Sequence, residues 1–217
     1  MTRTAFLAVA VALAGCSTTP PPAAPAPRQA TTTTTASSGA TTPSMVGTDG
    51  RPITQADVHF MTGMIGHHAQ AIKISGWAES HGASPSIQTL AARIIVSQTD
   101  EIHFMQNWLR DRGQPVPDAN PDHMQMSMPG MDHSALMPGM LTPEQMTELD
   151  KARGSDFDRL FLTDMMQHHR GAITMVEQLI NSPGAAQDDV VFKFISDVNA
   201  DQTTEIDRMN TMLTALK

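Results

Sequence analysis

An internal duplication constrains the fold of this chain more than any other feature of its sequence. The segment Asp57–Ile72 matches Asp158–Ile173 at a constant offset of 101 residues, and both segments contain a His-His pair. A second pair of segments, Gln98–Met105 and Gln202–Met209, matches at an offset of 104. The change of offset indicates a three-residue insertion in the second inter-helix loop, near residues 181–184. The folded part of the chain should therefore contain two copies of one structural unit.

Each copy is predicted to be a helical hairpin, because its apolar residues recur at helical spacing. The predicted helices span about residues 57–74, 86–110, 155–180 and 187–216. In the first of them, the 4-3-4-3 spacing of Phe60, Met64, His67, Ala71 and Ile74 is typical of a bundle seam. Four helices that each carry an apolar stripe bury those stripes economically in an all-α four-helix bundle.

The N-terminus resembles an export signal. Residues 1–15 contain Arg3 and an apolar run that is too short to cross a bilayer. The following Leu13-Ala14-Gly15-Cys16 resembles the bacterial lipobox, which implies cleavage before Cys16 and lipidation of its thiol. Ordinary secretory cleavage nearby is the alternative. We expect an exported protein that is lipid-anchored to the cell membrane, on its outer face or in the periplasm.

Residues 16–54 are rich in Thr, Pro and Ala, and they contain almost no large apolar side chain. Such a segment cannot bury enough surface to offset the entropy of ordering it, so we predict a disordered tether. The bundle is then expected to span 55–217, with hairpin one at 55–112, a Met/His-rich linker at 113–141 and hairpin two at 142–217. Thr142-Pro-Glu-Gln145 has the pattern of a helix start and predicts a short helix to about Ala152.

Composition excludes several classes of function. The net charge of -8 gives no basic surface for nucleic acid, so no nucleic-acid partner is expected. Cys16 is the only cysteine, which rules out a disulfide within the chain and any site built from several thiolates. Methionine is unusually common, at 17 of 217 residues. Methionine normally fills gaps in a core, but its thioether sulfur is also a soft metal ligand.

The duplicated His-His pairs are the first candidate metal site. Each pair has a methionine three residues before it, and a glutamate and a methionine four residues apart on the partner helix. The candidates are Met64, His67, His68 and Met105 in hairpin one, and Met165, His168, His169 and Met209 in hairpin two. A lone buried histidine is usually a hydrogen-bonded core residue, but its repetition in the same context favours a metal. We expect Glu101 and Glu205 to orient the imidazoles rather than to bind the metal.

The segment between the hairpins is a second candidate site. Its methionines and histidines follow no helix or strand period, and its Pro and Gly residues predict an exposed loop. The residues are His123, Met124, Met126, Met128, Met131, His133, Met137 and Met140. Thioethers suit Cu(I), and imidazoles suit copper or zinc, so copper is the predicted metal, with Cu(I) favoured over Cu(II). A hydrophobic flap over the bundle is the alternative interpretation of this segment.

These blocks resemble the DUF305 family. The resemblance rests on Phe157–Ile173, on Phe60–Ile72 and on the segment from Gln98 through Glu101 and Met105 to Leu109. It covers about residues 55–215 and implies an exported, ferritin-like four-helix domain that binds copper in some members. Gly63 and Gly66 depart from the pattern of the second copy, where Asp164 and Gln167 stand. Glycine weakens a helix, or it lets another element approach closely.

The leading hypothesis is a copper-binding protein, not an enzyme, that sequesters or hands on copper at the cell envelope. The alternatives are a ferritin-like redox enzyme and a metal-free interaction module of the envelope. A di-iron enzyme of the ferritin type would need Glu-x-x-His motifs on facing helices, and the sequence contains none. Whether the protein pairs with a second copy or with a copper-exchanging partner protein is left open.

Overall fold

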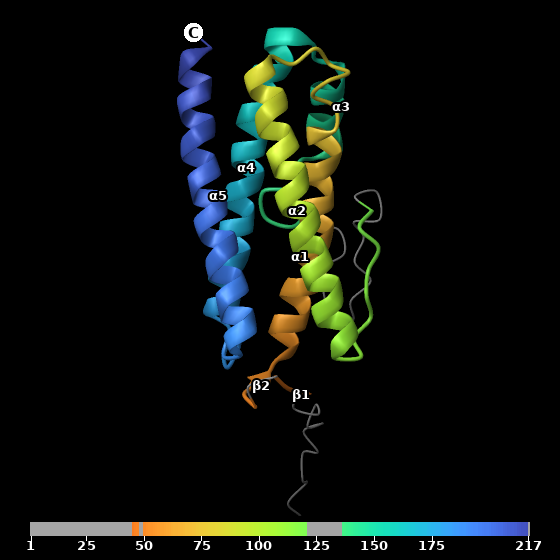
Figure 1. Cartoon of the computed structure of the whole chain (residues 1–217), viewed down its shortest axis with the longest axis vertical. Helices are drawn as coiled ribbons and strands as arrows, with labels where there is room; N and C mark the ends of the chain where they lie inside the picture. The colour runs from red at the N-terminus through yellow and green to blue at the C-terminus, as the bar shows by residue number, and fades with distance from the viewer. Residues whose placement is uncertain (1–44, 48–49, 121–135, 217) are drawn as a thin grey trace, which may run out of the picture. The chain divides into compact units, whose positions relative to one another are not determined.

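Five helices and one short β-hairpin form the part of the chain that the computed structural model describes, residues 45–47, 50–120 and 136–216. The helices are α1 (Gln55–Ser75), α2 (Pro85–Asp111), α3 (Pro143–Lys151), α4 (Gly154–Ile180) and α5 (Asp189–Ala215). The α1/α2 hairpin and the α4/α5 hairpin meet mainly along α1 and α4. Helices α1 and α5 run in one direction and α2 and α4 in the other (Figure 1). The predicted all-α, ferritin-like four-helix bundle of two hairpins is confirmed.

The helix starts follow the local sequence. Helix α1 begins with a capping box between Thr54 and Asp57, and α3 begins with the predicted box between Thr142 and Gln145. Pro85 occupies the first turn of α2, as predicted, although its N-cap residue Ser84 makes no side-chain cap hydrogen bond. These ends agree with the predicted helix bounds to within about two residues.

The extra residues of the second hairpin lengthen a helix, where the sequence predicted a longer loop. Helix α4 ends at Ile180, whereas the end of α1 at Ser75 corresponds to Val176 at the offset of 101. Gly76 follows α1 directly as its C-cap residue. In the second copy the apolar stripe continues through the buried Leu179, so the helix continues by another turn.

A small β-hairpin lies within the segment that the sequence predicted to be a disordered tether. Strand β1 (Met45–Val46) pairs antiparallel with β2 (Pro52–Ile53), with Met45 opposite Ile53. Ile53 is buried in the core, which anchors the hairpin at one end of the bundle. Strands of two residues have no period to detect, so the sequence did not reveal them. The predicted signal peptide, Cys16 and the tether up to residue 44 lie outside the described residues.

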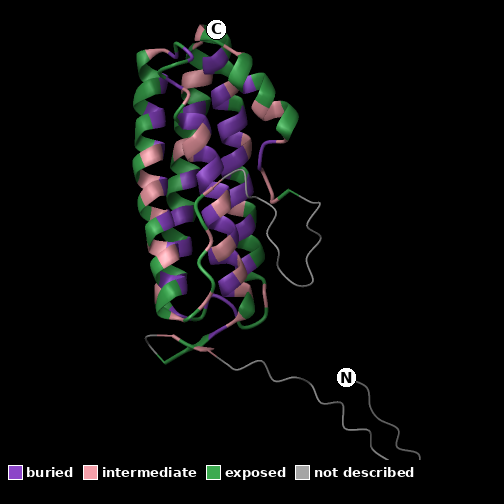
Figure 2. Cartoon of the chain, turned by 90° about the vertical axis from the view of Figure 1, so that its right-hand side faces the viewer, coloured by how far each residue is buried: buried purple, intermediate pink, exposed green. Residues whose placement is uncertain are grey.

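The core consists of two apolar clusters, and the buried residues lie on the inward sides of the helices (Figure 2). The β-end cluster contains Met64, Met105 and Phe194, and the α3-end cluster contains Phe157 and Met165. Along each of α1, α2, α4 and α5, buried polar residues separate the two clusters. This polar layer consists of His67, His68, Gln70, Gln98, His168, His169 and Gln202.

Two buried aspartates join the hairpins at opposite ends. Asp57 at the start of α1 accepts hydrogen bonds from the Thr54 N–H at 2.7 Å and from the Ala186 N–H, in the α4–α5 loop, at 2.8 Å. Asp158 near the start of α4 accepts a hydrogen bond from the Ser84 N–H, in the α1–α2 loop, at 3.1 Å. Each hairpin therefore satisfies a backbone donor in the loop of the other.

Replacing Asp57 with alanine should lower the free energy of unfolding by about 2–4 kcal/mol, because buried backbone donors lose a charged acceptor. The change is measured by urea denaturation. Asp158→Ala is the matched variant and should cost less, because the Asp158 carboxylate accepts from a single backbone N–H. Equal losses for the two variants would contradict this account of the contacts.

Candidate metal centre

Four imidazoles lie at the centre of the polar layer, all of them completely buried. His67 on α1 and His168 on α4 lie against each other, with ring centroids 3.8 Å apart. The His67–His68 and His168–His169 centroid distances are 6.4 and 6.3 Å, with interplanar angles of 59° and 57°. The two His-His pairs therefore have nearly the same geometry, as the duplication predicts.

His68 and His169, the outer imidazole of each pair, are each oriented by a carboxylate from the partner helix. His68 Nε2 contacts Glu101 Oε2, and His169 Nε2 lies 2.6 Å from Glu205 Oε2. An ionised carboxylate only accepts hydrogen bonds, so in the neutral form of the ring Nε2 carries the proton and Nδ1 keeps its lone pair. Neither Nδ1 atom has a hydrogen-bond partner. This is the arrangement in which a carboxylate orients an imidazole for metal binding.

The inner imidazoles, His67 and His168, differ in their hydrogen bonds. His67 Nε2 donates to the Pro138 carbonyl oxygen at 3.0 Å, which again leaves a lone pair on Nδ1. His168 has no hydrogen-bond partner on either ring nitrogen. The duplication supplies two equivalent histidines, but in the described part of the chain one linker segment crosses the bundle and, of the two, is hydrogen-bonded to His67 alone. One of the two histidines is therefore hydrogen-bonded to the linker, and the other is left bare.

Burial keeps the inner imidazoles neutral. Desolvation, followed by repulsion from the neighbouring His68, lowers the pKa of His67 to about 3, even though the Pro138 carbonyl opposes the shift. Desolvation, followed by the repulsion of His67, holds the pKa of His168 well below its ordinary value. Both rings are therefore uncharged at neutral pH, and each keeps a lone pair that a metal ion could accept.

The four predicted methionine ligands lie on both sides of the polar layer. Met64 and Met105 belong to the β-end cluster, and Met165 and Met209 belong to the α3-end cluster. All four side chains are completely buried. Among the described residues, no three His, Cys, Asp or Glu side chains form a group that could hold a metal ion. A metal at this centre would therefore need donors of another kind, such as thioethers.

The linker ends in a segment that packs onto the bundle. We call this segment, residues 136–141, the strap. Met137 packs against the β-end cluster, and Met140 is buried. The prediction that these two methionines belong to an exposed loop is therefore wrong. The cause is Gln70, whose side chain donates to the Leu141 carbonyl at 3.1 Å and accepts from the Leu141 N–H at 2.8 Å.

The other residues predicted for the loop site lie outside the described part of the chain. They are His123, Met124, Met126, Met128, Met131 and His133. Their role as metal ligands stays a prediction.

Two glycines let the strap reach His67. A Cβ atom on Gly171 of α4 would lie 2.0 Å from the Pro138 oxygen, and a Cβ on Gly139 would lie 2.6 Å from the Gly171 Cα. Gly139 also has a positive φ of 76°. Only glycine fits at these two positions, because any larger residue would push the strap away from the imidazoles. Gly66 lies under the strap too, where a Cβ would meet Met137 at 3.7 Å.

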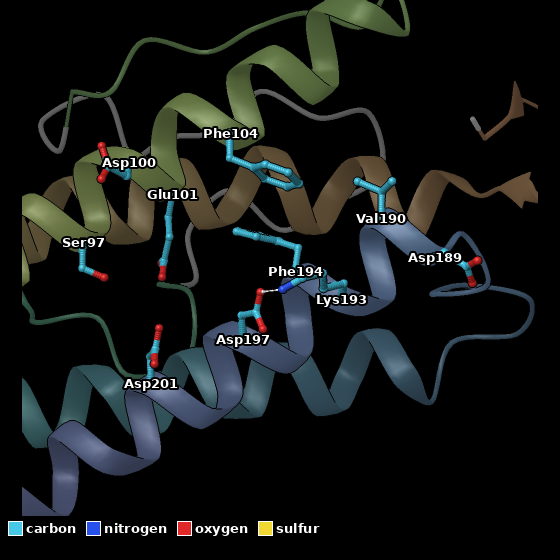
Figure 3. Close-up of a pocket in the computed structure, with 10 residues that line it drawn as sticks. All are labelled: Ser97, Asp100, Glu101, Phe104, Asp189, Val190, Lys193, Phe194, Asp197 and Asp201. Atoms are coloured by element: carbon cyan, nitrogen blue, oxygen red, sulfur yellow. Dashed lines mark hydrogen bonds and ion pairs between the residues drawn. The ribbon is translucent and has the colours of Figure 1, made fainter. Parts of the chain in front are cut away.

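A groove of about 650 Å³ lies between α2 and α5 (Figure 3). The rings of Phe104 and Phe194 stack in it at 4.5 Å, and Glu101 and Asp201 point toward each other across it. Burial, followed by the negative charges of Glu101, Glu205 and Asp197, raises the pKa of Asp201. Glu101 therefore faces this acidic groove and also contacts the buried His68.

Sequence reasoning missed the residues that position the strap. Gln70, Pro138 and Gly171 carry no spacing that would single them out, because their partners lie in another hairpin or in the linker. Gln98 and Gln202 were visible as a repeated pair, but the pattern alone did not indicate that both amides would be buried.

Residues 57–213 match the family model described as a domain of unknown function, DUF305. Uncharacterized protein L153 of Acanthamoeba polyphaga mimivirus is 41% identical over 56 residues, which cover 26% of this chain and 37% of that protein. The chain therefore spans little more than a third of the length of this curated relative.

The fold is similar to solved structures at 25–26% identity. A DUF305 protein from Streptomyces coelicolor, named as a candidate secreted protein, gives a TM-score of 0.62 at 25% identity and covers 74% of this chain and 93% of its own. CopM in its Cu(II)-bound form gives 0.58 at 25% identity, with 74% and 97% covered. CopM in its Cu(I)-bound form gives 0.55 at 26% identity, with 73% and 96% covered. CopM has also been solved in silver-bound forms.

Gly171→Ala should displace the strap and lower the free energy of unfolding by about 1–3 kcal/mol, as overpacking does in a dense contact. Gly66→Ala is the matched control, because its Cβ would make only an ordinary contact with Met137. Alanine also favours the helix there by roughly 1 kcal/mol relative to glycine. Urea denaturation of the two variants tests the prediction. A Gly171→Ala variant as stable as Gly66→Ala would rule out a tight strap.

Proposed function

Since the chain belongs to the DUF305 family over residues 57–213, we propose that its bundle binds copper and sequesters it or hands it on at the cell envelope. The observation that carries the proposal is the set of four buried imidazoles, each with an Nδ1 atom that has no hydrogen-bond partner. Burying such atoms unpaired costs free energy, and a metal that accepts their lone pairs would offset this cost.

The donor chemistry favours copper over harder metals. The available donors are the four imidazoles and the thioethers of Met64, Met105, Met165 and Met209. Thioethers are soft ligands that suit Cu(I), and imidazoles suit both copper states. Copper- and silver-bound structures of the relative CopM support the same choice. We favour Cu(I) as the principal cargo.

The acidic groove between α2 and α5 offers the cation a route toward the imidazoles. Carboxylates lining a cleft raise the local concentration of cations by electrostatic attraction. Glu101 lies in this groove and contacts His68, so the groove leads to the polar layer.

We propose a binding protein rather than an enzyme of the ferritin type. Glu101 and Glu205, the carboxylates in contact with the polar-layer histidines, each contact one imidazole. A di-iron centre would need its carboxylates as bridging metal ligands, with Glu-x-x-His motifs on facing helices. A metal-free interaction module remains the competing function, and metal titration separates the two.

Export and lipid anchoring at Cys16 are proposed from the N-terminal sequence. The Streptomyces coelicolor relative, a candidate secreted protein, supports export. Within residues 45–47, 50–120 and 136–216, no helix is long and apolar enough to cross a membrane.

The protein should bind Cu(I) more tightly than Zn²⁺ or Fe²⁺ in competition titrations, because thioethers contribute to the site. Replacing His168 and His169 with leucine should remove most of the copper bound by the bundle while the helical circular dichroism survives. Equal or tighter iron binding by the unaltered protein would contradict the copper assignment.

The matched control for that titration is His81→Leu. His81 is also buried, but both of its ring nitrogens have partners, Ser80 Oγ at 2.9 Å and the Asp150 carbonyl at 2.9 Å. Its loss should leave copper binding unchanged. Deleting residues 123–135 in the same assay tests the proposed loop site, and a lower copper stoichiometry with an intact bundle is the expected result.

Cys16→Ser should move the protein from the membrane fraction to the soluble fraction of the cell envelope, because serine has no thiol to lipidate. Fractionation and mass spectrometry of the mature N-terminus measure the change. Cys16 is the only cysteine, so no other thiol can take over the modification. A protein that stays membrane-bound after the substitution would contradict lipid anchoring at this residue.

A further inference from the structure

Two glutamines in the polar layer have amide groups that the protein does not satisfy. Gln98 on α2 is 2% exposed, and neither its Oε1 nor its Nε2 has a hydrogen-bond partner. Gln202 on α5 is 3% exposed, and its Oε1 has no partner. A buried unpaired amide destabilises a fold. If these positions served packing alone, an apolar residue such as leucine would stabilise the fold more than glutamine does.

The two glutamines occupy equivalent places in the duplicated hairpins. Gln98 lies one turn before Glu101, which contacts His68, and Gln202 lies one turn before Glu205, which contacts His169. Each glutamine interrupts the apolar stripe of its helix between the two clusters. Helices α1 and α4 thus supply imidazole nitrogens to the polar layer, and helices α2 and α5 supply the unpaired amide oxygens.

Resting on the proposed copper function, we propose that Gln98 and Gln202 are ligands through which this centre holds Cu(II), whereas the methionines serve Cu(I). Cu(II) prefers sets of nitrogen and oxygen donors, and Cu(I) prefers soft sulfur. The polar layer contains imidazole nitrogens and amide oxygens. The thioethers of Met64 and Met105 lie in the cluster on one side of it, and those of Met165 and Met209 lie in the cluster on the other.

This segregation of donors explains why the amides are retained although they are unpaired. A bundle that held Cu(I) alone could use imidazoles and thioethers and fill positions 98 and 202 with apolar side chains. Oxygen donors at this level become useful when the bound ion is Cu(II), because Cu(II) then finds harder ligands within the same layer. Gln98 and Gln202 are therefore specificity-determining residues for the oxidation state of the cargo.

The test is a double variant, Gln98→Leu with Gln202→Leu, in the full chain. Affinities for Cu(II) and for Cu(I) are measured separately, each against a chelator of known affinity for that oxidation state. The Cu(II) affinity should fall at least about tenfold, as it does on loss of a partner group at a metal site, and the Cu(I) affinity should stay within about threefold. The thermal midpoint of the metal-free protein should not fall, because unpaired amides have been removed.

Two further variants make the result decisive. Gln98→Glu with Gln202→Glu keeps an oxygen at each position and should bind Cu(II) at least as tightly as the unaltered protein. Met64→Leu with Met165→Leu should show the reciprocal pattern, with Cu(I) binding weakened and Cu(II) binding retained. If the leucine pair fails to fold, the glutamate and methionine variants still test the assignment.

The inference is overturned if the leucine pair binds Cu(II) normally, or if it loses Cu(I) and Cu(II) equally. It is also overturned if the glutamate pair binds Cu(II) more weakly than the unaltered protein. These outcomes differ from failure of the proposed function, in which the unaltered protein binds neither form of copper.

Discussion

The rest of the structure depends on the hydrogen bond between a buried imidazole and a carboxylate on the neighbouring helix. It occurs twice, as His68–Glu101 and His169–Glu205. In each hairpin it fixes the register of two antiparallel helices, because buried polar groups must find a partner. It also fixes the tautomer of the ring and leaves Nδ1 bare. One interaction therefore sets both the alignment of the hairpin and the chemistry at its centre.

Duplication gives the bundle an approximate two-fold symmetry, and the strap breaks it. The strap contacts His67 through Pro138 and passes α4 at Gly171, and none of the described segments does the same for His168. The asymmetry appears in glycine content as well, since Gly66 lies beneath Met137 where the second copy has Gln167. Two chemically identical histidines thus have different surroundings, and of the two only His168 has no hydrogen-bond partner on either ring nitrogen.

Much of the fold could be predicted from the sequence because it depends on periodicity and on repetition. The stripe Phe60, Met64, His67, Ala71 and Ile74 is buried throughout, and the box at Thr142 starts a helix as expected. Comparing the two copies predicted that Glu101 and Glu205 would orient imidazoles, but not that Glu101 would contact His68. The strap could not be predicted in this way, because Gln70 and Leu141 lie 71 residues apart in elements of different kinds. Burial of Gln98 and Gln202 depends on helix packing, which a spacing pattern does not encode.

The crossed contacts of Asp57 and Asp158 have a consequence for assembly. Asp57 at the start of α1 binds the α4–α5 loop, and Asp158 at the start of α4 binds the α1–α2 loop. The same contact is thus made in both directions, as in a symmetric dimer in which each subunit uses the same surface. The covalent linker converts that association into an intramolecular step, so its strength no longer depends on protein concentration. A two-chain dimer with the same interface would fall apart on dilution, whereas the two halves of this chain stay together at any protein concentration.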